Sequence, residues 1–337
     1  MSDTKYDVVG IGNAIVDILA QCEDEFLRRE DIHKGSMTLI DAERAAHLYE
    51  KIGPTTMVSG GSAANTIAGI AGLGGTAAYI GRVHKDDLGH GFTHDMKALG
   101  IHYPTAAAET GLSTACCIIL VTPDGQRSMS TFLGASTDFS LADMDEDTIA
   151  ASQIVYLEGY LFDKPPAKEA FYQAVRLAKK HGRKVALSLS DGFCVDRHRE
   201  DFHALLKEGV DILFANEVEA TALFQKNSLE ESLPAIAAAC PIAVVTRSEK
   251  GALILSGEKT HTVYAEAVAK VVDTTGAGDS YAAGFLYGLT HGYDLPSCGR
   301  IASICAAEVI SHIGPRPQTN LKKLLESKMG ASFKKAS

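Results

Sequence analysis

A segment near the end of the chain has the residue types of a phosphoryl-transfer site. It reads Val-Asp-Thr-Thr-Gly-Ala-Gly-Asp-Ser over residues 272–280, between an expected strand and an expected helix. The backbone N–H groups of Gly276, Ala277 and Gly278 would point outward and, with the helix dipole, form an anion hole. Asp279 at the mouth of this hole could accept the proton of an attacking hydroxyl as a general base. The alternative is that Asp279 only caps the helix, although a turn needs fewer small residues than this.

A second segment suits a magnesium ion. Residues 211–222 read DILFANEVEATA, and Asn216, Glu217 and Glu219 follow a strand that is expected to end at Ala215. Carboxylate and amide oxygens at this edge of a strand match Mg²⁺, which keeps several waters and binds through few carboxylates. Taken alone, the segment fits a helix cap with favourable dipole charges better than it fits a metal site.

Two further features could bind an acceptor molecule. The pair Gly60-Gly61 precedes an expected helix and would let a substrate touch the backbone, while Asn65 could bind sugar hydroxyls. The alternative for this segment is close packing of the helix on a sheet. Asp17 is a lone charge within the apolar residues 11–20, and a buried carboxylate is costly without a partner. A ligand hydroxyl and a nearby backbone donor are equally good partners for it.

Strands and helices alternate after residue 141 and predict the scaffold that positions these groups. We expect strands at 154–157, 185–189, 211–215 and 242–246, helices at 168–181, 201–207, 217–224, 278–291 and 297–310, and a hairpin at 252–264. Earlier, we expect a strand ending at Gly12, a helix at 62–73 with Ser62 as its N-cap, a strand at 76–80 and a helix at 88–99. Such alternation implies a parallel sheet with helices on both faces.

Two early β segments, residues 14–40 and 111–133, do not fit this alternation. They could pair into one small sheet that forms a lid over the strand ends, where ligands bind in such folds. The predicted fold is α/β and doubly wound, with a mostly parallel sheet flanked by helices and a small β lid. The predicted core is 1–12, 42–110 and 134–329, the lid is 13–41 and 111–133, and residues 330–337 are a tail.

The composition narrows the possible partners. The 337 residues carry a net charge of −10, which argues against a protein that binds nucleic acid or an anionic membrane. The seven cysteines have no CxxC or metal-ligand spacing and no signal peptide is evident, so we expect a reduced cytoplasmic chain. The chain lacks GxxxxGK[ST], and GIGNAI lacks the third glycine of GxGxxG. These absences exclude a P-loop enzyme and argue against a nicotinamide-dependent oxidoreductase.

At this point two long segments resemble a known family. Residues 60–89 and 271–289 look like the first and second signatures of the ribokinase-like (PfkB) kinases, in the right order. The resemblance implies that Asp279 is the catalytic base beside the anion hole, and that Asn216 and Glu219 organise Mg²⁺. It also implies that the nucleotide lies near Asn216, Thr246, Ser248, Gly251 and Thr275, although family members often have glycine where Ser248 stands.

Within this family, three segments are similar to the adenosine kinases: residues 10–17, 187–193 and 210–220. The similarity implies that Arg127 reaches the transferred phosphate. It implies that Asp17, Gly61 and Asn65 bind the ribose, and that Asn13 and Gly60 lie beside them. The base pocket would be formed by Ile15, Ser36, Thr38 and Tyr160.

The sequence thus predicts an ATP- and Mg²⁺-dependent kinase that phosphorylates the 5′-hydroxyl of adenosine, as a monomer or homodimer. A monovalent cation such as K⁺ is left open as a further cofactor. The alternatives are a sugar kinase, a kinase for another nucleoside, and a nucleoside-binding protein that has lost catalysis.

Overall fold

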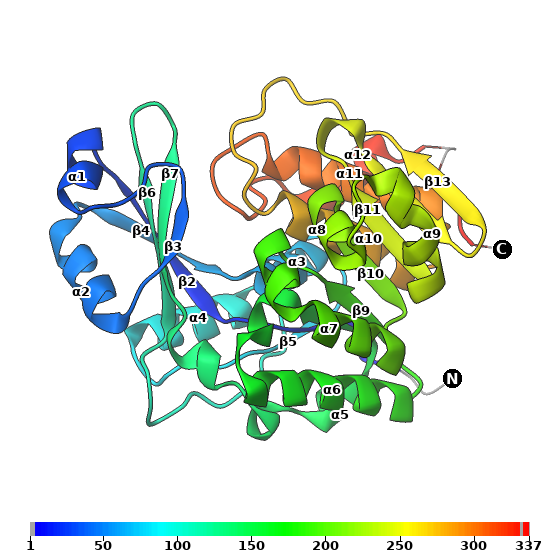
Figure 1. The fold of residues 1–337 in the computed structure, drawn as a ribbon, viewed down its shortest axis with the longest axis horizontal. Helices are drawn as coiled ribbons and strands as arrows, with labels where there is room; N and C mark the ends of the chain where they lie inside the picture. The colour runs from blue at the N-terminus through cyan, green and yellow to red at the C-terminus, as the bar shows by residue number, and fades with distance from the viewer. Residues whose placement is uncertain (1–3, 331–332, 337) are drawn as a thin grey trace.

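The computed structural model describes residues 4–330 and 333–336, which form two sheets with their covering helices (Figure 1). In spatial order, the larger sheet consists of β13 (Lys259–Val263), β12 (Ala252–Ser256), β11 (Ile242–Thr246), β10 (Ile212–Asn216), β9 (Lys184–Ser188), β8 (Ser152–Glu158), β1 (Tyr6–Ile11) and β5 (Ala77–Ile80). The strands from β11 to β5 run parallel, and β12 and β13 are added antiparallel at one edge. This is the predicted α/β architecture.

Helices cover both faces of the larger sheet. One face carries α3 (Ser62–Gly72), α10 (Ala277–Thr290), α11 (Leu295–Val309) and α12 (Leu321–Lys328). The other carries α5 (Glu146–Ala150), α6 (Pro165–Lys180), α7 (Gly192–Gly209), α8 (Glu217–Phe224) and α9 (Leu229–Ala239). Neighbouring strand residues face opposite sides, so Val8 belongs to the first hydrophobic core and Val9 to the second. Short 3₁₀ turns lie at Gly134–Asp138, Leu141–Asp143, Gly159–Asp163 and Ser248–Lys250.

The smaller sheet stands beside the larger one (Figure 1). Its order is β3 (Met37–Leu39), β7 (Arg127–Phe132), β6 (Ala115–Val121), β2 (Ile15–Gln21) and β4 (Thr55–Gly60). Helix α2 (Ala42–Lys51) packs on β6 and β7, α4 (Asp87–Ala98) contacts β2 and β4, and α1 (Asp24–Arg29) follows β2. The two predicted β segments therefore do share one sheet.

The structure corrects the predicted lid boundary. We expected residues 42–110 in the core, but β4 pairs antiparallel with β2, with Ile15 opposite Gly60. The chain therefore reaches the glycine pair from the smaller sheet, and α2 also belongs to that side. The sequence did not predict α2, α9 or α12, and α7 begins at Gly192, well before the expected residue 201.

The uncharged glycine- and alanine-rich stretch forms a tightly packed helix. Eight residues of α3 are buried, and a Cβ on Gly69 would lie 2.7 Å from the Cβ of Ala283 in α10. Small residues allow this close approach of α3 and α10, which brings the first turns of the two helices together. Among the described residues, no helix is long and apolar enough to cross a membrane.

Candidate active site

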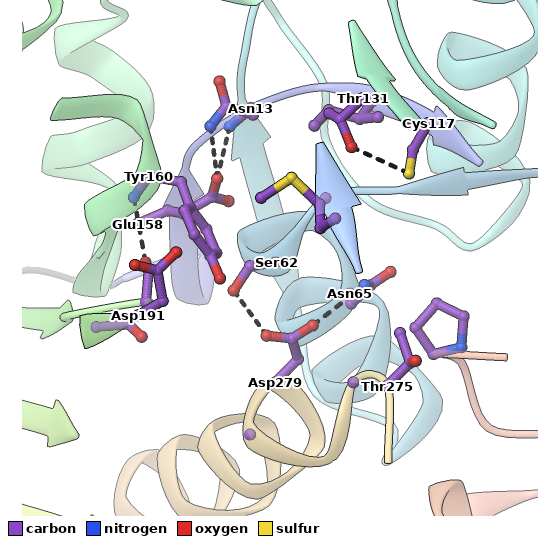
Figure 2. Close-up of a pocket in the computed structure, with 18 of the residues that line it drawn as sticks. Asn13, Ser62, Asn65, Cys117, Thr131, Glu158, Tyr160, Asp191, Thr275 and Asp279 are labelled. Atoms are coloured by element: carbon purple, nitrogen blue, oxygen red, sulfur yellow. Dashed lines mark hydrogen bonds between the residues drawn. The ribbon is translucent and has the colours of Figure 1, made fainter. Parts of the chain in front are cut away.

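A cavity of about 720 Å³ lies between the two sheets, at the carboxyl ends of the parallel strands. Both sheets and the first turn of α10 contribute to its wall (Figure 2). Most residues predicted for the site line it, namely Asn13, Ile15, Asp17, Gly61, Asn65, Tyr160, Asn216, Glu219, Thr246, Thr275, Gly276, Gly278 and Asp279. The fold thus collects groups from distant parts of the chain into one chamber.

Asp279 lies at the meeting point of α3 and α10. Its carboxylate accepts hydrogen bonds from Ser62 Oγ at 2.6 Å and from Asn65 Nδ2 at 3.1 Å (Figure 2). Burial raises the pKa of Asp279 to about 6, against the lowering effect of these two hydrogen bonds. The carboxylate is therefore ionised at neutral pH, yet basic enough to take a proton from a reacting hydroxyl.

Ser62 is not the N-cap that the sequence predicted. Gly61 occupies that position, and Ser62 is the first residue of α3. Its hydroxyl is used to bind Asp279 instead of an N–H group of its own helix. The capping rule failed here because a partner from a distant helix competes for the hydroxyl.

The loop before α10 presents part of the predicted anion hole. Gly276 is the N-cap of α10 with φ of 76°, and a Cβ there would lie 2.5 Å from the carbonyl oxygen of Pro315. The N–H groups of Gly276 and Gly278 have no acceptor among the described residues, and both glycines line the cavity. Ala277 differs from the prediction, because its N–H closes a turn to the Thr274 carbonyl at 3.2 Å and it does not line the cavity.

Arg127 ties the smaller sheet to the same loop. Its Nη1 lies 2.8 Å from an oxygen of Asp273 and 3.4 Å from Thr275 Oγ1. Arg127 does not line the cavity, but its buried Nη2 has no hydrogen-bond partner among the described residues. The predicted contact with a phosphate therefore requires the guanidinium to move or to use this free nitrogen.

Asn216 and Glu219 form a reciprocal cap at the start of α8. Asn216 Oδ1 accepts from the Glu219 N–H at 2.8 Å, and Glu219 accepts from the Asn216 N–H at 2.9 Å and from its Nδ2 at 2.6 Å. Both residues also line the cavity, so the helix-cap and metal interpretations are compatible. Burial raises the pKa of Glu219 to about 7, and the negative charge of Asp191 acts in the same direction.

Asp17 and Asn13 line the opposite part of the cavity. Asp17 is 8% exposed, and no described residue donates a hydrogen bond to its carboxylate. Burial raises its pKa to about 7, although Arg316 and Arg127 act in the other direction. Gly60 lies behind Asp17 and does not line the cavity, since a Cβ on Gly60 would be 2.4 Å from Asp17 Oδ2.

Glu158 is a site residue that sequence reasoning missed. It ends β8, lines the cavity, and accepts a hydrogen bond from Asn13 Nδ2 at 2.8 Å (Figure 2). It also accepts one from the Ala63 N–H at 2.7 Å. Burial raises its pKa to about 7. It belongs to no motif, and the only available signal was a charged residue directly after an apolar strand.

At β3 the cavity is lined by other residues than those predicted for the base pocket. Met37 and Leu39 line the cavity, whereas Ser36 and Thr38 do not, because side chains alternate along the strand and the chosen residues point the other way. The wall at this end is apolar and also contains Ile15, Ile119, Met129 and Leu133, with Cys117 and Tyr160 beside them. On the nucleotide side, Ser248 and Gly251 lie outside the cavity wall, in a turn that the Arg247 N–H closes to the Gly251 carbonyl.

Comparison with known proteins gives a consistent picture. The sequence profile of the pfkB family carbohydrate kinases matches residues 35–322. The adenosine kinase of Saccharomyces cerevisiae is 27% identical over 330 residues, covering 91% of this chain and 96% of that protein. The 5-dehydro-2-deoxygluconokinase of Bacillus licheniformis is 30% identical over 263 residues, covering 75% of this chain and 80% of that protein.

Two solved structures share both fold and sequence with the chain. A probable sugar kinase from Rhizobium etli is 50% identical with a TM-score of 0.89, covering 96% of this chain and 99% of that one. An adenosine kinase from Sinorhizobium meliloti is 48% identical with a TM-score of 0.90, covering 96% and 100%. The chain therefore belongs to the pfkB family of carbohydrate kinases and is a phosphotransferase that acts on an alcohol group.

Proposed function

We propose that this protein transfers the γ-phosphate of ATP to the 5′-hydroxyl of adenosine. Kinases of this family use ATP and Mg²⁺. The observation that carries the proposal is the position of Asp279, a half-buried carboxylate beside the N–H groups of Gly276 and Gly278, which have no acceptor among the described residues. A general base next to an anion hole is the arrangement that phosphorylation of a hydroxyl requires.

In this mechanism Asp279 accepts the proton of the 5′-hydroxyl as the hydroxyl oxygen attacks the γ-phosphorus. The bond between the γ-phosphorus and the bridging oxygen breaks, and ADP leaves with its electron pair. The Gly276 and Gly278 N–H groups donate to the oxygens of the transferring group, and Arg127 adds positive charge there. Mg²⁺ bound near Asn216 and Glu219 would neutralise phosphate charge. Removing one donor from an anion hole costs about 2.7–4 kcal/mol of transition-state stabilisation.

The acceptor would lie across the cavity with its sugar and base in different surroundings. Asp17 and Asn65 line the cavity and would face the ribose hydroxyls, for which the Asp17 carboxylate would be an acceptor. A flat nucleobase would pack against the apolar wall formed by Ile15, Met37 and Leu39. A free pentose or hexose would leave this wall without a partner, so the wall favours a nucleoside over a sugar.

We propose that the smaller sheet is a lid. It carries Asp17, Met37 and Arg127, so its closure on the larger sheet would complete the site and exclude water from the reaction. The bond between Arg127 and Asp273 already links the two sides. The predicted monovalent cation, the oligomeric state and the cytoplasmic location stay predictions.

The acceptor is tested with a panel of adenosine, inosine, guanosine, cytidine, ribose and fructose, each with ATP and Mg²⁺, read by ADP release. We expect the highest kcat/KM with adenosine. A higher kcat/KM for a free sugar would replace the proposed acceptor with the sugar alternative. If no acceptor in the panel stimulates ADP release, the proposal that this protein phosphorylates adenosine fails.

The role of Asp279 is tested by Asp279→Asn, which keeps the size of the side chain but removes the base. We expect kcat to fall by about 10²–10⁴, the contribution of general base catalysis. Adenosine binding, measured by calorimetry, should remain close to that of the parent protein. Asp87→Asn, on the exposed first turn of α4, is the control for loss of one carboxylate. Near-normal turnover of Asp279→Asn would remove the base from the mechanism.

A further inference from the structure

Arg316 lies in the loop between α11 and α12 and contacts the site through Asn65. Its Nε donates a hydrogen bond to Asn65 Oδ1 at 3.3 Å, while Asn65 Nδ2 donates to Asp279 at 3.1 Å. An arginine can only donate, so it must face the oxygen end of the amide. The contact with Arg316 therefore turns the nitrogen end of Asn65 toward the carboxylate of Asp279.

The guanidinium of Arg316 also acts on Asp17. Among the charged groups near Asp17, Arg316 has the largest effect in lowering the pKa of that carboxyl, ahead of Arg127. Arg316 Nη2 is buried and has no hydrogen-bond partner among the described residues. The same guanidinium thus contacts the amide that binds Asp279 and lowers the pKa of the Asp17 carboxyl.

The loop that carries Arg316 is held on both sides. Before Arg316, the Gly314 N–H donates to Asp273 at 2.8 Å, and the Pro315 carbonyl lies directly against Gly276. After it, the N–H groups of residues 318 and 319 both donate to the buried Glu308 carboxylate, at 3.0 and 2.9 Å. The guanidinium is therefore presented from a fixed backbone that also supports the anion hole.

We propose that Arg316 is a positioning residue for phosphoryl transfer: it fixes the orientation of the Asn65 amide that aligns Asp279. This inference rests on the proposed role of Asp279 as base. Arg316 does not line the cavity, so it acts through Asn65 and not by touching the substrate.

The test is a double-mutant cycle that combines Arg316→Met with Asn65→Ala, using adenosine and ATP. We expect Arg316→Met alone to lower kcat about tenfold, the size of losing one hydrogen bond to a charged group. In the Asn65→Ala background, Arg316→Met should lower kcat by less than about twofold. The effects of two substitutions in one hydrogen-bond network are not additive, because the first substitution already removes the shared contact. Arg28→Met, an exposed arginine of α1, is the control for loss of one positive charge.

The pH profile provides a readout that a purely structural role would not change. Without Arg316 the pKa of Asp17 rises further, so the acid limb of kcat/KM should move to higher pH. Arg316→Lys should restore this limb, since it keeps the charge, but not kcat, since it lacks the Nε–H of the planar guanidinium. The other titratable and charged groups that face Asp17 are Arg127 of β7, Asp279 of α10, and the thiols of Cys116 and Cys117 in β6.

Two results would overturn the positioning role. One is a tenfold loss of equal size in both backgrounds of the cycle, and the other is an Arg316→Met enzyme with the kcat and acid limb of the parent. If Arg316→Met does not fold, as judged by circular dichroism, the cycle is run with Arg316→Lys. An inactive Asp279→Asn with a fully active Arg316→Met would reject only this inference, whereas an active Asp279→Asn would reject the proposed base itself.

Discussion

The ionised Asp17 side chain should lower the free energy of unfolding of the ligand-free protein. Asp17→Asn should remove this destabilisation. An ordinary aspartate has a pKa of 3.8, and burial raises that of Asp17 to about 7. Since one pKa unit corresponds to about 1.4 kcal/mol, the ionised side chain lowers the free energy of unfolding by about 4 kcal/mol above pH 7. Asn has nearly the same shape and carries no charge. We therefore expect Asp17→Asn to be more stable than the parent at pH 8 by about this amount.

The sign of the pH dependence follows from the raised pKa. The folded protein binds a proton at Asp17 that the unfolded chain has already released, so the parent loses stability as pH rises from about 4 to about 7. At pH 5 the carboxyl is protonated in the folded state, and the advantage of Asp17→Asn shrinks to about 2 kcal/mol. The advantage of the variant should therefore increase by about 2–3 kcal/mol between pH 5 and pH 8.

The measurement is urea unfolding of both proteins without ligand at pH 5, 6.5 and 8. Comparing the two proteins at each pH cancels the titration of every group that they share. Asp87→Asn, at an exposed position of α4, is the matched control for loss of one carboxylate. Saturating adenosine should stabilise the parent more than the variant, because ribose hydroxyls satisfy the Asp17 carboxylate. A difference that is zero at pH 8, or equal at all three pH values, would falsify the claim that Asp17 is held in an unfavourable ionised state.

Two further predictions concern the reaction and the loop before α10. The kcat/KM for adenosine should fall as pH decreases through about 7 to 6, because both Asp17 and Asp279 must be ionised. Burial raises the pKa of Asp17 to about 7 and that of Asp279 to about 6. A fall in kcat/KM only near pH 4 would contradict this prediction. Gly276→Ala should lower kcat at least about tenfold, because φ is 76° there and the new Cβ would lie 2.5 Å from the Pro315 carbonyl oxygen, which displaces an N–H donor. The control is Gly257→Ala in the turn between β12 and β13, where φ is also positive but the Cβ meets open space, so equal kcat in the two variants would show that the clash does not matter.

The proposed base and the loop before it could be predicted from the sequence because their chemistry is local. Gly276, Gly278 and Asp279 follow one another at the start of a helix, and the adjacent backbone supplies the N–H groups and the dipole that make the segment useful. The larger sheet was predictable for a similar reason. Strand and helix alternate with a regular period, and this pattern allows few topologies.

The tertiary structure decided what depends on contacts between distant segments. The sequence could not show that Ser62 binds Asp279, that Glu158 holds Asn13, or that Arg316 reaches Asn65, since these partners are 217, 145 and 251 residues apart. Nor could it show which side of a three-residue strand faces the cavity, because a shift of one residue reverses every side chain. The residue types for catalysis are thus encoded locally, while their alignment and their raised pKa values arise only from burial between two sheets.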